Sequence, residues 1–137
     1  MWWVYALLSA LFAALTAIFA KIGIQGVNTD LATAIRTVVI LILAWAIAYF
    51  RGGLGTMQTL TKQNMIFLVL SGLATGMSWI FYFKALQMGK VSQVAPVDKL
   101  SVAIAIVLSV VFLGEVLTLK AAIGAVLIII GTIVLIL

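Results

Sequence analysis

The chain is a succession of long apolar runs separated by short polar or glycine-containing segments. A helix needs about 20 apolar residues to cross a hydrocarbon core roughly 30 Å thick. Measured against that length, the pattern predicts five membrane-spanning helices in a single domain that covers residues 1–137. The predicted spans are residues 2–20, 31–50, 64–83, 91–113 and 121–137. Because the connections are short and unpaired strands are too costly in lipid, we expect an all-α bundle of antiparallel neighbours.

The first apolar run, residues 2–20, has the position of a secretory signal peptide but differs from one in two ways. It is longer than the apolar region of a signal peptide, and no basic segment precedes it. We therefore expect it to be the first transmembrane helix.

The composition agrees with a membrane protein and argues against several other classes of function. Hydrophobic residues make up 66% of the chain and charged residues 8%, and the mean hydropathy is +1.39. A soluble domain is typically about half apolar and a quarter charged. Cysteine and histidine are absent and only three carboxylates occur, so we expect no enzyme activity, no metal site and no cofactor. The eight basic residues are dispersed rather than clustered, which argues against binding to nucleic acid.

Small residues recur in the predicted spans at the spacing of helix-packing faces. Gly72 and Gly76 form a GxxxG pair, and Gly124 and Gly131 lie seven residues apart. Small side chains let helix backbones approach closely in lipid. These residues predict packing faces inside the bundle, and the alternative is that one of them is a seam between two copies.

Three charged residues, Arg36, Asp98 and Lys99, lie within the predicted spans. A charge inside a membrane is expensive and is retained mostly where it faces a cavity, a partner charge or a substrate. Pro96 lacks a backbone N–H and is expected to interrupt the fourth span, as in the broken helices of transporters. Lys99 follows about eight residues into this span, roughly 12 Å along the helix. The segment around Pro96 is therefore the candidate functional site.

Adjacent residues on a helix point about 100° apart, so we expect Asp98 and Lys99 to face different partners. We predict that Arg36 pairs with Asp98, which would leave Lys99 to bind an anionic group such as a carboxylate or phosphate. Two alternatives remain open. In the first, Asp98 takes up and releases a proton and so couples proton movement to the movement of a substrate. In the second, Asp98 and Lys99 pair with groups on other helices and only stabilise the fold.

Polar side chains on nearby turns and aromatic side chains at the end of the third span complete the candidate site. The whole candidate substrate-binding set is Arg36, Trp79, Tyr82, Gln93, Pro96, Asp98, Lys99 and Ser101.

The basic residues at the ends of the spans give no clear orientation, although an excess of Lys and Arg normally marks the cytoplasmic side. The N-terminal side carries Arg51, Lys62 and Lys120, and the opposite side carries Lys21, Lys84 and Lys90. Such a balance is typical of a chain that inserts both ways. It predicts an antiparallel homodimer, with a parallel oligomer as the alternative.

Several motifs have a recognisable order and spacing. They are the aromatic-rich segment 79–86, Val94-Ala95-Pro96, Phe112-Leu113-Gly114-Glu115, Gly124-Ala125-Val126-Leu127 and, more loosely, Ala20-Lys21-Ile22-Gly23 and Arg36-Thr37. Together they resemble one EamA repeat of the drug/metabolite transporter superfamily, over essentially the whole chain.

The resemblance implies a five-helix half-transporter, because most members carry two such repeats of opposite orientation around a central cavity. A ten-helix antiparallel homodimer in the cytoplasmic membrane would rebuild that arrangement. The expected function is secondary transport or export of a small anionic or zwitterionic metabolite by alternating access. The first span lacks the carboxylate that related small multidrug exporters use, which argues against exchange of cationic drugs. The alternatives are a flippase for a lipid-linked sugar or other amphiphile, and a non-transporting membrane subunit of a larger complex.

Overall fold

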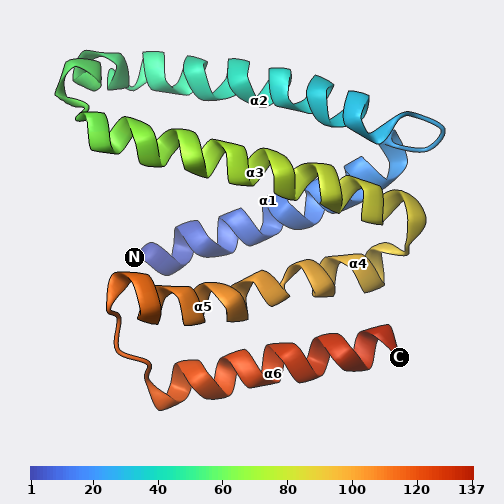
Figure 1. Ribbon diagram of the computed structural model, residues 1–137. Coiled ribbons are helices and arrows are strands. Elements are labelled where there is room, and N and C mark those ends of the chain that lie inside the picture. Colours follow the sequence, from blue (N-terminus) through green and yellow to red (C-terminus); the bar gives the residue numbers. More distant parts are fainter. The chain divides into compact units, whose positions relative to one another are not determined.

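The structure, a computed structural model, describes all residues from Met1 to Leu137 and is helical with no strands (Figure 1). The elements are α1 (Trp2–Gly23), α2 (Thr29–Phe50), the 3-10 helix η1 (Gly53–Thr59), α3 (Lys62–Met88), α4 (Val91–Asp98), α5 (Leu100–Leu113) and α6 (Leu119–Ile136). Five segments are long and apolar enough to cross a membrane, and α4 and α5 together form the fourth of them. The five predicted spans therefore correspond to five helices of the length and hydropathy that crossing a membrane requires.

Three helices, α2, α3 and α6, begin two residues earlier than predicted, and side chains cap their first turns. The Asn28 side chain accepts hydrogen bonds from the backbone N–H groups of Asp30 (2.8 Å) and Leu31 (3.1 Å). The Thr118 hydroxyl accepts one from the N–H of Ala121 at 3.2 Å. Each cap satisfies N–H groups that have no partner within the helix.

Helix α3 runs five residues beyond its predicted end, where groups from the last turn of α1 and from the α1–α2 turn bind its last turn. The Lys21 ammonium donates a hydrogen bond to the carbonyl of Leu86. In return, the Gln87 side chain donates to the carbonyls of Ile24 (3.2 Å) and Val27 (2.9 Å). Carbonyls at the end of a helix or in a turn need partners when water is excluded. These three hydrogen bonds join the end of α3 to the α1–α2 turn.

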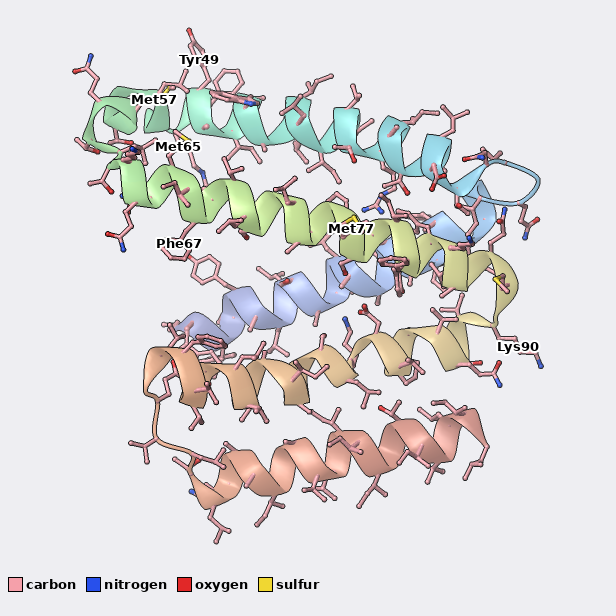
Figure 2. The ribbon with its side chains drawn as sticks, in the orientation of Figure 1. Tyr49, Met57, Met65, Phe67, Met77 and Lys90 are labelled. Carbon is pink, nitrogen blue, oxygen red and sulfur yellow. The ribbon has the colours of Figure 1, made fainter.

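The chain forms two compact units. Unit 2 comprises Ala20–Gln87 and contains α2 and α3, which run side by side and are joined through η1 (Figure 1). Figure 2 places Met57 and Met65 at this junction and shows Tyr49 directed away from the ribbon at the same end of α2. Unit 1 comprises Met1–Phe19 and Met88–Leu137, and within it α6 packs along both α4 and α5. Each unit positions one part of the candidate site.

The single chain buries little of its apolar surface. In an 18-residue apolar stretch of each span, only 6–11% of the residues are buried inside the chain. The buried apolar side chains are Ala17, Ala20, Ile24, Phe83, Leu86 and Ala103. Lipid or other protein must cover the remaining apolar side chains, since large exposed apolar surfaces mark membrane or protein contacts.

The glycine faces of α3 and α6 are also unpacked. A Cβ at Gly72, Gly76, Gly124 or Gly131 would meet no atom within 4 Å. The prediction that these residues form packing faces inside the bundle is therefore not confirmed by this chain. The alternative, a seam between two copies, stays open.

We expect Lys21→Met to destabilise the protein, because this change keeps the side-chain length but removes the donor to the Leu86 carbonyl. A hydrogen bond to a charged donor contributes about 1.5–3 kcal/mol in soluble proteins, and hydrogen bonds in membranes contribute less on average. We expect a loss of about 1–2 kcal/mol, measured as a lower unfolding midpoint in detergent. Lys84→Met is the matched control, because Lys84 is an exposed lysine on α3. Equal midpoints for the two variants would contradict this account of the end of α3.

Candidate functional site

The fourth span is interrupted at a single residue, Lys99, between α4 and α5. The backbone N–H of Lys99 is shared between the carbonyls of Ala95 (3.3 Å) and Pro96 (3.0 Å). This sharing tightens the helix, as 3-10 geometry does at helix ends. Pro96 itself has no N–H to donate to the Ser92 carbonyl four residues earlier. The predicted interruption near Pro96 is confirmed, and the break lies three residues after the proline.

Thr132 of α6 holds the broken segment from the side. Its hydroxyl lies 3.2 Å from the Pro96 carbonyl and 2.8 Å from the Ile128 carbonyl of its own helix. The side chain is almost fully buried, with 3% of its surface exposed. A threonine in an apolar helix commonly bonds its own i−4 carbonyl, and here the hydroxyl also reaches the neighbouring helix. Thr132 therefore connects α6 to the break.

Asp98 and Lys99 form an ion pair at the break. The Lys99 Nζ lies 3.2 Å from Asp98 Oδ2, and the side chains are 57% exposed for Lys99 and 33% exposed for Asp98. We expected the two side chains to face different partners, but the flexible lysine chain and the interrupted helix bring their ends together. The pairing of Asp98 with Arg36 stays a prediction, because Asp98 belongs to unit 1 and Arg36 to unit 2.

Gln93 and Ser101 flank this ion pair along the chain. Gln93 lies in the first turn of α4 and Ser101 in the first turn of α5, and both side chains are exposed. Exposed amide and hydroxyl groups can donate and accept hydrogen bonds. Their role in binding a substrate stays a prediction.

Arg36 forms a second polar centre, in unit 2. It lies seven residues into α2, about 10 Å along the helix. Its guanidinium carbon lies 4.8 Å from the centre of the Trp79 ring and 4.4 Å from that of the Phe83 ring. Trp79 and Phe83 are four residues apart and so share one face of α3. The Tyr82 ring contacts the Phe83 ring, with 5.9 Å between centroids.

The hydrogen-bonding capacity of Arg36 is not satisfied within its own unit. Its Nη1 atom is buried and has no hydrogen-bond partner. The nearby Thr33 hydroxyl, on the same face of α2, donates to the Thr29 carbonyl at 2.8 Å. Aromatic rings attract a cation within about 6 Å but offer no lone pair for its N–H groups. A buried donor without an acceptor is costly, so an acceptor from outside this unit would stabilise the guanidinium by binding Nη1.

The structure divides the predicted site residues between the two units. Unit 2 brings together Arg36, Trp79 and Tyr82, and unit 1 brings together Asp98 and Lys99 close after Pro96. Sequence reasoning did not include Phe83 and Thr132. Phe83 is detectable from its i+4 spacing to Trp79, and Thr132 is the only polar side chain in the apolar run 121–137.

The five apolar helices, the interrupted span and the charges inside the spans define a multi-pass membrane protein with the features of a solute transporter. Comparison with known families agrees with this class, because the profile of the EamA-like transporter family matches residues 1–137, the whole chain. The chain belongs to the EamA-like transporter family.

Two relatives are informative. An "uncharacterized transporter in cobO 3′ region" from Sinorhizobium sp is 50% identical over 123 residues, which are 90% of this chain and 87% of the relative. An uncharacterized protein of Methanocaldococcus jannaschii is 39% identical over 77 residues, which are 56% of each chain. No solved structure matches the chain significantly. The first alignment covers nearly all of both chains, so the two proteins are of similar length.

We expect Thr132→Val to loosen the break in the fourth span, because valine keeps the shape but removes the donor to the Pro96 carbonyl. Interhelical hydrogen bonds in membrane proteins average about 0.6 kcal/mol, with values up to about 1.7. We expect a loss in this range in a detergent unfolding titration. Thr75→Val is the matched control, because the Thr75 hydroxyl bonds only the Ser71 carbonyl of its own helix. A Thr132→Val variant as stable as this control would contradict the link from α6 to the break.

Proposed function

We propose that the protein is a secondary transporter that exports a small anionic or zwitterionic metabolite across the cytoplasmic membrane. It acts as an antiparallel homodimer by alternating access. Membership of the EamA-like transporter family supports transport in general, and a relative of similar length is named as a transporter. The metabolite class and the mechanism are inferred from the charges of this chain.

The observation that carries the proposal is the ion pair Asp98–Lys99 at an interrupted membrane helix. A lysine in a span needs a partner charge when no substrate is bound, and Asp98 supplies it. An anionic substrate group can compete with Asp98 for the ammonium, because a carboxylate or phosphate makes the same kind of charged contact. The partial exposure of both side chains leaves the pair accessible for such an exchange.

Two observations support the antiparallel homodimer. Three basic residues lie on each side of the membrane at the ends of the spans, so neither orientation is favoured. The glycine faces of α3 and α6 have open space beside them, which a second copy can fill by close helix packing. Two copies of opposite orientation would supply the inverted repeats on which many transporters are built.

We expect Lys99→Gln to abolish export while the protein still folds and assembles. Cells that produce the wild-type protein should release at least one anionic or zwitterionic metabolite several-fold faster than cells that produce the variant. The measurement is an untargeted comparison of metabolites in cells and medium by mass spectrometry. Lys90→Gln is the matched control, because Lys90 is an exposed lysine at the start of α4, directed away from the ribbon in Figure 2, with no side-chain capping bond.

Equal release by the wild-type protein and Lys99→Gln would contradict the role of Lys99. Two other results would replace the proposal. A change confined to lipid-linked sugars would identify a flippase, and stable purification with a different protein without any metabolite change would identify a subunit of a larger complex.

We expect the chain to insert in both orientations. The absence of cysteine allows single cysteines at Gly55, where a side chain meets no atom within 4 Å, and at Met88, which is 83% exposed. These positions lie at opposite ends of α3. A membrane-impermeant maleimide should label about half of each variant in intact cells, and all of it after lysis. Complete labelling of one position and none of the other would show a fixed orientation and exclude the antiparallel dimer.

A further inference from the structure

Positive charge is concentrated in the unit that contains Arg36. Residues 20–87 include five basic residues and one acidic residue, Asp30, whereas unit 1 includes three basic and two acidic residues. Asp30 lies six residues before Arg36 on α2, about 9 Å along the helix axis, and forms no ion pair with it. The side chains of unit 2 therefore supply no carboxylate that neutralises the guanidinium.

The aromatic contacts hold Arg36 in place without using its donors. Trp79 and Phe83 lie within the distance at which an aromatic face attracts a guanidinium. Neither ring accepts a normal N–H hydrogen bond, and Nη1 remains buried without a partner. A planar guanidinium with a fixed position and free N–H groups matches the geometry of carboxylate and phosphate, which it binds through two parallel hydrogen bonds.

We propose that Arg36, held by Trp79 and Phe83, is a binding site for the oxyanion group, carboxylate or phosphate, of a small water-soluble molecule. The inference rests on the proposed transport function and assigns an anion-binding residue within unit 2, whereas Lys99 belongs to unit 1. Phe83 is completely buried, whereas Trp79 is partly exposed. Trp79 is therefore the ring that a bound molecule can touch, and its fluorescence can report binding at Arg36.

The test uses the full chain with Trp79 as its only tryptophan, made by replacing Trp2, Trp3 and Trp45 with phenylalanine. The protein is held in maltoside detergent, which contains neither phosphate nor carboxylate. Acetate, inorganic phosphate or phosphatidylglycerol is added at constant ionic strength, with chloride as the reference anion. We expect a saturable change in Trp79 emission with acetate or inorganic phosphate, and the more effective of the two identifies the group.

Variants separate the role of Arg36 from a general effect of charge. Arg36→Gln should weaken the response roughly tenfold or more, because two charge-assisted hydrogen bonds are lost. Arg36→Lys keeps the charge but not the planar fork and should give an intermediate response. This variant still tests the role of the guanidinium if the glutamine variant does not fold. Arg51→Gln is the matched control, because Arg51 is an exposed arginine at the other end of the same helix.

Several results would overturn the inference. They are the absence of a saturable response to acetate and phosphate, an equal response in Arg36→Gln, and a response to phosphatidylglycerol alone, which would identify a lipid headgroup as the occupant. Export by wild-type cells without a Trp79 response would refute this site and leave the proposed function standing. A Trp79 response lost in Arg36→Gln, without any export, would refute the proposed function and leave the site standing.

Discussion

The absence of water in the bilayer core is the constraint on which the other features of this protein depend. Each backbone N–H and C=O group within lipid must find a partner in the protein, which is why the spans are helices. The one place where the chain departs from this rule is the fourth span, where Pro96 removes a donor. After the proline, the Lys99 N–H is shared between the Ala95 and Pro96 carbonyls, and the Thr132 hydroxyl also reaches the Pro96 carbonyl.

The same constraint applies to charges, and the chain meets it in two different ways. Asp98 and Lys99 neutralise each other, and an anionic substrate has to compete with Asp98 for the Lys99 ammonium. Arg36 is instead stabilised by the π electrons of Trp79 and Phe83, which attract the cation but leave its buried Nη1 without an acceptor. A charge held in this second way is the more open to an external anion, because no carboxylate of its own unit must first be displaced.

Much of the fold is predictable because the length of an apolar run is a local property. The five spans and the interruption near Pro96 follow from run lengths and from the missing proline N–H, and the structure agrees with both. The predicted helix bounds differ from the structure at the starts of α2, α3 and α6 and at the end of α3. The cap at Asn28 is local and could have been recognised, but the extension of α3 depends on the bond from Lys21 to Leu86, 65 residues away in the sequence.

By itself the sequence determined that the protein resides in a membrane, how many times it crosses, where a helix is broken and which family it belongs to. It also identified most of the polar residues that are costly in lipid. Only the tertiary structure decided which groups from other helices contact those residues: the Trp79 and Phe83 rings for Arg36, and the Pro96 carbonyl for Thr132. The reason is physical. Hydropathy depends on neighbouring residues along the chain, whereas side-chain pairing depends on the rotation and register of packed helices, and many arrangements have the same hydropathy.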